Sequence, residues 1–114
     1  MKPLQGIRVV DFGRVLSVPY GTMQLADLGA DVVKIEHPEY GDDTRSFGPP
    51  FVRDVSTYFV SVNRGKRSVA LDLKDENDVD FVKELISVAD VVVENFRPGV
   101  MKKLGLDFAA VSKD

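Results

Sequence analysis

Residues 91–99 have the sequence Val-Val-Val-Glu-Asn-Phe-Arg-Pro-Gly, and this stretch decides the fold class. Three consecutive β-branched apolar residues are typical of a strand that is buried on both faces, as strands of a parallel sheet are. The polar, basic and turn-forming residues that follow at once indicate that the strand runs directly into a loop. In open α/β sheets, loops at the carboxyl ends of the strands form the ligand site.

Upstream of this stretch, three segments repeat the same organisation. Residues 7–11, 31–36 and 68–73 are predicted as strands, and helical patterns occupy residues 19–28 and 76–88. Residues 37–55 hold three prolines and predict a long surface loop, followed by a short helix over 56–62. This alternation predicts an α/β fold with a Rossmann-like, open and mostly parallel sheet flanked by helices.

Capping residues predict where the helices begin and end. Gly29 is expected to stop the first helix, and Gly105 to stop a short helix that Pro98 begins. The predicted N-caps are Ser17, Ser56, Asp75 and Asp107.

The composition excludes several kinds of function. The 114 residues contain no Cys and one His, so disulfides, thiol nucleophiles and His-rich or Cys-based metal sites are not expected. The net charge of −3 argues against nucleic acid as the main partner. No apolar stretch is long enough to span a membrane, and a cytoplasmic protein without a membrane partner is expected.

Basic residues follow two of the predicted strands. On a parallel sheet they would gather at one edge, where a phosphorylated ligand needs cations; solvated surface lysines are the simpler alternative. Lys66 and Arg67 precede a strand and are expected at the opposite edge. The residues of the predicted cationic cluster are Lys74, Arg97, Lys102 and Lys103, with Arg97 the strongest candidate.

Three further residues have two interpretations each. Asn95 and Phe96 either bind an amide-rich arm and stack on an adenine, or form a turn and part of the core. His37 is more simply a solvated loop residue than a catalytic base, with no partner nearby in sequence. A nicotinamide-dependent oxidoreductase is disfavoured, because no G-x-G-x-x-G follows the first strand.

Ordered motifs along essentially the whole chain resemble the family III CoA-transferases, of the carnitine dehydratase and bile-acid-inducible type. The matching segments are PLQGIRVVDF (3–12), LADLGADVVKIE (25–36), GDDTR (41–45), NRGKRS (63–68), LDLK (71–74) and ADVVVENFRPG (89–99). The resemblance implies that residues 1–114 are the N-terminal CoA-binding part of the large domain. It also implies an incomplete sheet relative to the full family fold, and an interlocked homodimer in the full-length protein.

The resemblance implies a set of CoA contacts and no metal. Departures from the family pattern at Leu16, His37 and Lys103 argue against an oxalate-type substrate. The implied contact residues for CoA or acyl-CoA are Leu16, Ser17, His37, Leu71, Asp72, Leu73, Lys74, Asn95, Phe96, Arg97 and Lys103.

The reaction implied by the resemblance moves CoA between an acyl-CoA and a carboxylic acid through an aspartyl intermediate. The nucleophilic aspartate is expected beyond Asp114, so no catalytic residue is assigned within the chain. Two alternatives stay open: a non-catalytic CoA-binding or structural fragment, and an acyl-CoA racemase of the same family.

Overall fold

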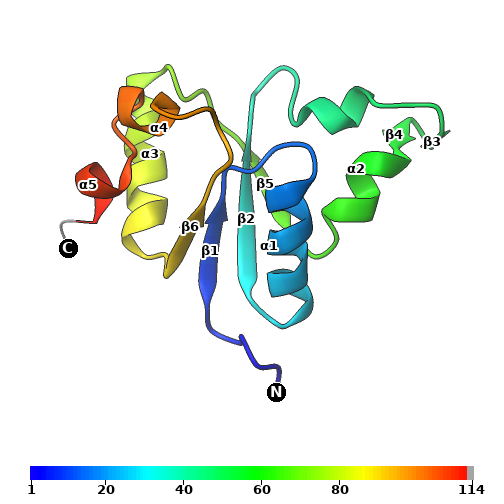
Figure 1. Cartoon of the computed structure of the whole chain (residues 1–114), viewed down its shortest axis with the longest axis horizontal. Coiled ribbons are helices and arrows are strands. Elements are labelled where there is room, and N and C mark those ends of the chain that lie inside the picture. The colour runs from blue at the N-terminus through cyan, green and yellow to red at the C-terminus, as the bar shows by residue number, and fades with distance from the viewer. Residues whose placement is uncertain (113–114) are drawn as a thin grey trace.

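Apolar strands form one parallel sheet at the centre of the molecule (Figure 1). The structure, a computed structural model, describes residues 1–112. The strands run in the order β5-β2-β1-β6, so β1 and β2 are internal and β5 and β6 are edges. Their bounds are β1 (Arg8–Asp11), β2 (Asp31–Glu36), β5 (Arg67–Ala70) and β6 (Val91–Val93). The predicted parallel α/β fold is confirmed.

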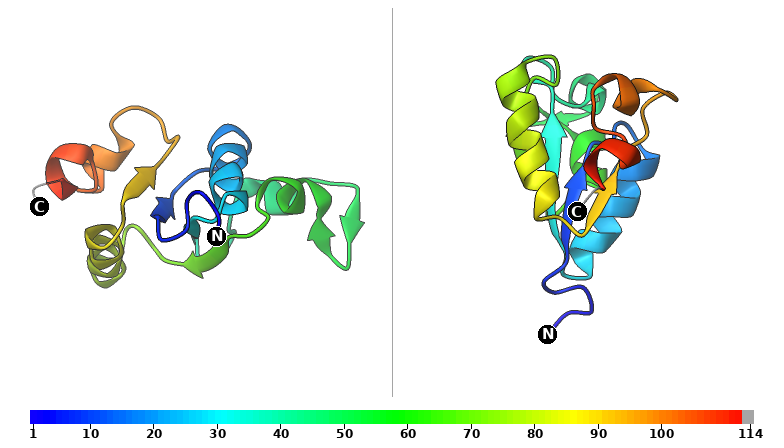
Figure 2. Two further views of the ribbon diagram at one scale, coloured as in Figure 1. Left: turned by 90° about the horizontal axis from the view of Figure 1, so that it is seen from below. Right: turned by 90° about the vertical axis from the view of Figure 1, so that its left-hand side faces the viewer.

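The two longest helices cover opposite faces of this sheet (Figure 2). Alternate side chains of β1 point to opposite faces, so Val9 and Val10 enter different cores. On one face Val9 packs beside α1 (Ser17–Asp27). On the other, Val10 packs against Val82 and Ile86 of α3 (Glu76–Ser87). Burial on both faces explains the continuous apolar runs of the sequence.

Most predicted helix ends are confirmed. Gly29 follows α1 with a φ of +106°, a left-handed conformation that favours glycine. Asp75 caps α3 by accepting hydrogen bonds from two backbone N–H groups, and Ser56 and Asp107 cap the helices that follow them.

Two predicted helix starts are wrong. Ser17 is already the first residue of α1 and its side chain makes no capping bond, since Leu16 takes the N-cap position. Pro98 lies outside α4 (Val100–Lys103), which begins only after Gly99 turns the chain with a φ of +89°. Because α4 is one turn long, its helix dipole contributes little to the electrostatic potential at the ends of the strands.

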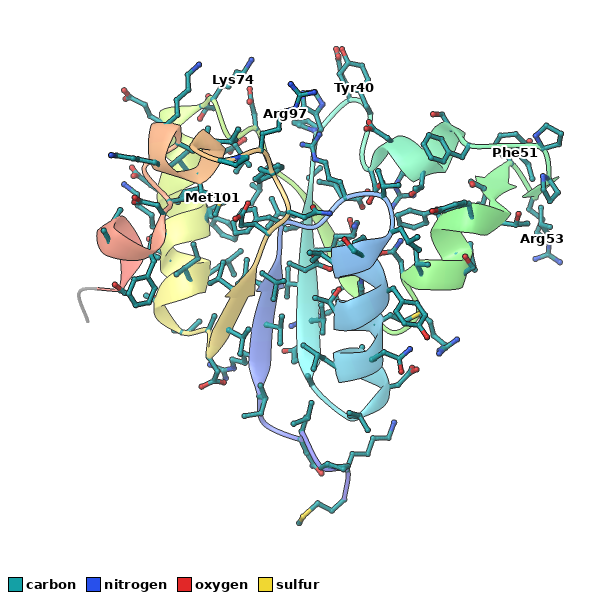
Figure 3. The ribbon with its side chains drawn as sticks, viewed as in Figure 1. Tyr40, Phe51, Arg53, Lys74, Arg97 and Met101 are labelled. Atoms are coloured by element: carbon teal, nitrogen blue, oxygen red, sulfur yellow. The ribbon has the colours of Figure 1, made fainter. Side chains whose placement is uncertain are left out.

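Residues 37–55 contain more structure than the predicted loop. A 3-10 helix, η1 (Asp43–Ser46), is followed by the hairpin of β3 (Phe51–Val52) and β4 (Val55–Ser56) and then by α2 (Thr57–Val62). Arg53 and Asp54 form the hairpin's two-residue turn, both with positive φ. Phe51 and Arg53 lie on the part of the molecule farthest from α3 (Figure 3).

The strand ends differ from the sequence prediction by a few residues. β5 ends at Ala70 and not at Leu73. Leu71, Asp72 and Leu73 therefore lie outside the sheet, beyond the carboxyl ends of its strands. β6 ends at Val93, and the chain passes through α4 to α5 (Phe108–Val111). Within residues 1–112, none of the helices has the length and apolar character needed to cross a membrane.

The free edge of β6 leads to a prediction about self-association. β6 pairs only with β1 in the described part of the chain, and a hollow of about 840 Å³ lies between β6, α3 and α5. Phe108 beside it is 83% exposed, and Val91 and Phe81 are also exposed. We expect the isolated chain to self-associate, because unpaired strand edges and exposed apolar groups promote association. Sedimentation velocity at several concentrations measures this; a single monomer boundary throughout would contradict it.

Candidate functional site

A cleft of about 400 Å³ opens where β2, β5 and β6 end. Its walls come from the segments that leave these strands, together with the loop after β1 and the one-turn helix α4. The side chains that line it are Arg14, Ile35, Glu36, His37, Leu71, Asp72, Leu73, Lys74, Phe96, Val100 and Leu104.

The structure brings together about half of the predicted contact residues. The predicted residues that line the cleft are His37, Leu71, Asp72, Leu73, Lys74 and Phe96. Leu71 through Lys74 contribute as a group because the chain leaves β5 before Leu71 and crosses the strand ends.

The other predicted residues lie outside the lining of the cleft. Asn95 and Arg97 flank it on the segment after β6, and Leu16 is 50% exposed on the loop after β1. Figure 3 shows Arg97 and Lys74 beyond the same end of the sheet. The set outside the lining is Leu16, Ser17, Asn95, Arg97 and Lys103.

Some lining residues were not singled out from the sequence as contacts. Arg14 is the most informative, because its guanidinium carbon lies 5.2 Å from the centre of the Phe96 ring. Its position three residues after the predicted strand 7–11 was a signal that could have found it. Val100 and Leu104 are apolar residues of the α4 region, and Ile35 belongs to the core beneath the cleft.

The Phe96 ring packs in the core, as one of its two interpretations predicted, and it also borders the cleft. It packs against the core cluster and lies 6.4 Å from the ring of Phe12, which is fully buried. Its other contacts are with the cleft and the Arg14 guanidinium. The core therefore fixes the ring in the wall of the cleft.

Asn95 joins the loops after β1 and β6. Its amide oxygen accepts a hydrogen bond from the Arg14 backbone N–H, and its amide nitrogen donates to the Arg14 carbonyl oxygen, both at 2.9 Å. The residue is more than the turn former that the sequence allowed, since it links positions 81 residues apart.

A buried ion pair supports the loop after β1 from below. The Lys34 ammonium lies 2.9 Å from an Asp42 carboxylate oxygen, with both side chains 1% exposed, and it donates to the Gly13 carbonyl oxygen at 2.9 Å. Burial by itself raises the pKa of Asp42, but hydrogen bonds from Thr44 and Lys34 outweigh it and hold that pKa below its usual value.

Glu36, at the end of β2, is held ionised beneath the cleft. The Arg45 guanidinium donates to both carboxylate oxygens at 2.8 Å, and the Ser68 hydroxyl and Asp42 backbone N–H also donate to Glu36. Burial opposes ionisation, yet the hydrogen bonds from Arg45, Ser68 and Asp42 lower the pKa of Glu36 to about 2.

Lys66 and Arg67 do not line the cleft, but the prediction that both lie at the opposite edge of the sheet is wrong for the Lys66 ammonium, which reaches the carboxyl end of β1. The Lys66 ammonium lies 2.9 Å from an Asp11 carboxylate oxygen, and burial lowers the pKa of Lys66. Asp11 also accepts a hydrogen bond from the Thr22 hydroxyl at 2.6 Å, which ties β1 to α1. Arg67 pairs with Asp31 at the surface.

His37 is more constrained than a solvated loop residue. Its ring stacks on Tyr40 with centres 4.5 Å apart, and its Nδ1 accepts hydrogen bonds from the backbone N–H groups of Glu39 and Tyr40. The expectation that nothing nearby in sequence pairs with it is wrong, because the turn after β2 folds Tyr40 back over the ring. Because Nδ1 accepts these bonds, the tautomer with the proton on Nε2 fits this arrangement.

The fold is that of an α/β protein with a cleft at the carboxyl ends of a parallel sheet, and the cations Arg14, Lys74 and Arg97 lie at this end of the sheet. The family model for CoA-transferase family III matches residues 4–114, and the chain belongs to this family.

Several known proteins are similar to the chain over nearly its full length. The succinyl-CoA:glutarate CoA-transferase of Mus musculus is 54% identical, over 99% of this chain and 26% of that protein. The acetyl-CoA:oxalate CoA-transferase of Acetobacter aceti is 51% identical, over 97% of this chain and 28% of that protein. A crystal structure of a CAIB/BAIF family protein from Brucella suis superposes with a TM-score of 0.92 at 46% identity, covering 97% of this chain and 30% of that one. The chain thus spans about a quarter of the length of the curated relatives it matches.

Proposed function

We propose that this chain binds CoA or acyl-CoA in the cleft at the ends of β2, β5 and β6, as the N-terminal CoA-binding part of a family III CoA-transferase. The observation that carries the proposal is the cleft itself. It gathers Lys74, His37, Phe96 and the segment from Leu71, which the family resemblance implies as CoA contacts.

The chemistry of the cleft suits a phosphorylated ligand with an apolar arm. Cations at Lys74 and Arg14 are suited to phosphate oxygens, and Arg97 lies at the same end of the sheet. Leu71, Leu73 and the Phe96 ring offer apolar surface for the arm and for stacking of a base.

We propose that the full reaction transfers CoA from an acyl-CoA to a carboxylic acid, through an aspartate supplied from outside the described residues. The three most buried carboxylates near the cleft are already engaged: Glu36 with Arg45, Asp42 with Lys34, and Asp11 with Lys66. A carboxylate held by a cation is a poor nucleophile, so these groups are structural. In the full-length protein we propose an interlocked homodimer, as the family resemblance implies.

The engaged carboxylates also support a second candidate, in which the chain binds CoA but performs no transfer by itself. The 114-residue chain is incubated with succinyl-CoA and glutarate, and glutaryl-CoA is measured by chromatography. This experiment distinguishes CoA transfer by the chain from CoA binding without transfer. Product formation by the chain alone would exclude the second candidate. The racemase alternative is disfavoured, since the relatives described above carry transferase names.

The names of the relatives suggest a dicarboxylic acid as acceptor, with glutarate or succinate as first choices. Departures from the family pattern at Leu16, His37 and Lys103 argued against oxalate. However, a relative named for oxalate is 51% identical, so overall similarity does not separate the two acceptors.

Removal of two cations tests the proposed CoA site. We expect Lys74→Ala with Arg97→Ala to weaken CoA binding by at least roughly 100-fold, because each charge-assisted hydrogen bond to phosphate is worth about 1.5–3 kcal/mol. Isothermal titration calorimetry of the 114-residue chain measures the affinity.

The matched control for this test is Lys83→Ala with Arg8→Ala. It removes the same charges from the exposed side of α3 and from the amino end of β1. Equal CoA affinities for the wild-type chain and the Lys74 and Arg97 variant would contradict the proposed site.

A further inference from the structure

We propose that Arg14 is an anion-binding residue of this cleft and that Asn95 acts as its positioning residue. The inference rests on the proposed CoA function and deepens it, because it names the group that binds an anionic oxygen of the ligand. That group is either a phosphate of CoA or a carboxylate of the acyl moiety.

The Arg14 side chain lines the cleft and, within residues 1–112, has no polar partner in the protein. Its guanidinium lies over the Phe96 ring in the wall of the cleft. Within residues 1–112, the guanidinium makes no ion pair and no hydrogen bond, whereas Arg45, Arg64 and Arg67 all pair with carboxylates. A guanidinium stacked on a ring keeps its edge N–H donors free for a bidentate contact with phosphate or carboxylate.

The backbone that carries Arg14 is fixed on both sides. Val15 adopts a φ of +67°, unusual for a β-branched residue, and its N–H points at the Asp42 carboxylate, 3.3 Å away. A Cβ on Gly13 would lie 2.2 Å from a Val18 methyl, so the tight turn before Arg14 requires glycine. Backbone strain of this kind persists where surrounding contacts enforce it, and it is common at binding sites.

Asn95 provides the most direct of these restraints. Its amide oxygen and nitrogen each make a 2.9 Å hydrogen bond to the Arg14 backbone, so both polar atoms of the side chain serve the loop. The family resemblance implied that Asn95 contacts CoA. The geometry points instead to an indirect role, in which Asn95 fixes the residue that binds the anion.

Affinities for CoA, acetyl-CoA and succinyl-CoA test the inference in the wild-type chain, Arg14→Gln, Asn95→Ala and the double variant. We expect Arg14→Gln to weaken the affinity for the ligand roughly 10- to 100-fold. Asn95→Ala is expected to lose less affinity than Arg14→Gln. The double variant should lose no more affinity than Arg14→Gln alone, because the Asn95 amide acts through Arg14. Full additivity would show that Asn95 acts independently, and unchanged affinities for all three ligands in Arg14→Gln would overturn the role of Arg14.

The choice of ligand identifies the anion. An equal loss for all three ligands assigns the Arg14 contact to a phosphate of CoA. A loss confined to succinyl-CoA assigns the contact to the distal carboxylate of the acyl group. Arg14→Lys should rescue only part of the affinity, because an ammonium lacks the planar fork.

Controls separate binding from folding. Arg8→Gln makes the same change at the opposite end of the sheet and should leave all affinities unchanged. The melting temperature of Arg14→Gln should stay close to that of the wild-type chain, because within residues 1–112 the guanidinium makes no ion pair or hydrogen bond and loses only its contact with the Phe96 ring. If Asn95→Ala does not fold, Asn95→Gln keeps the amide but displaces it by a methylene, and gives the same comparison.

An NMR titration distinguishes failure of this inference from failure of the CoA proposal. The Nε–H resonance of Arg14, assigned by its loss in Arg14→Gln, is followed as inorganic pyrophosphate or succinate is added. A saturable shift supports the anion site even if the wild-type chain binds no CoA. No shift with either anion, together with unchanged affinities in Arg14→Gln, would overturn the inference while leaving CoA binding intact.

Discussion

Replacing Lys34 with Met is expected to lower the free energy of unfolding by about 3–5 kcal/mol, which is a large part of the stability of a small domain. The ammonium of Lys34 and the carboxylate of Asp42 are 2.9 Å apart, and both side chains are buried. Without Lys34, the Asp42 carboxylate stays in the interior without its directly bonded counter-charge, and the Gly13 carbonyl loses its donor. Urea unfolding followed by circular dichroism measures the change.

Two further variants show whether the lost charge pair is the cause. Lys83→Met removes a charge from the exposed surface of α3 and should change stability by less than about 0.5 kcal/mol. Lys34→Met combined with Asp42→Asn removes both charges and should recover part of the loss. A change below about 1 kcal/mol for Lys34→Met would contradict the buried ion pair.

Acid is expected to destabilise the chain by about 3 kcal/mol through Glu36 alone. The hydrogen bonds from Arg45, Ser68 and Asp42 lower the pKa of Glu36 from 4.5 to about 2 in the folded state. Each pKa difference of one corresponds to about 1.4 kcal/mol. Because the folded pKa is the lower one, the stabilisation is fully present above about pH 5 and is lost as the pH falls toward 2. Asp42 contributes in the same direction, since its pKa is also lowered.

Urea unfolding at a series of pH values between 7 and 2 measures this dependence. Glu36→Gln should be less stable at pH 7, because Arg45 loses its charged partner, but it should lose less stability between pH 5 and pH 2. Glu84→Gln, at an exposed position on α3, is the matched control and should follow the wild-type curve. An acid slope in Glu36→Gln equal to that of the wild-type chain would show that another group is responsible.

These buried pairs also explain how the cleft is built. Lys34, Asp42 and Glu36 lie just below the segments that carry Arg14 and His37, so their hydrogen bonds hold the rim of the cleft. A buried ion pair often stabilises a protein no more than apolar residues of similar volume would. We therefore interpret these pairs as groups that position the rim of the cleft.

Local sequence patterns were sufficient to predict the fold class, the cores of the strands and most of the helix ends. Runs such as Val91–Val93 identify parallel strands because burial on both faces requires apolar residues without alternation. Asp75 and Gly29 marked helix ends because their capping chemistry is local. The segment from Leu71 to Lys74 could be selected as a contact segment because it resembles a family motif at the end of a predicted strand.

Which residues face the cleft depends on contacts between segments that are distant in sequence, and only the tertiary structure shows these contacts. Arg14 and Asn95 are 81 residues apart, and they meet only because β1 and β6 are neighbours in the sheet. The pairing of Lys34 with Asp42 and the stacking of His37 on Tyr40 depend on how residues 37–46 fold back over the end of β2. Local propensity does not encode such contacts, because their free energy arises from burial and charge pairing between segments that the sheet brings together.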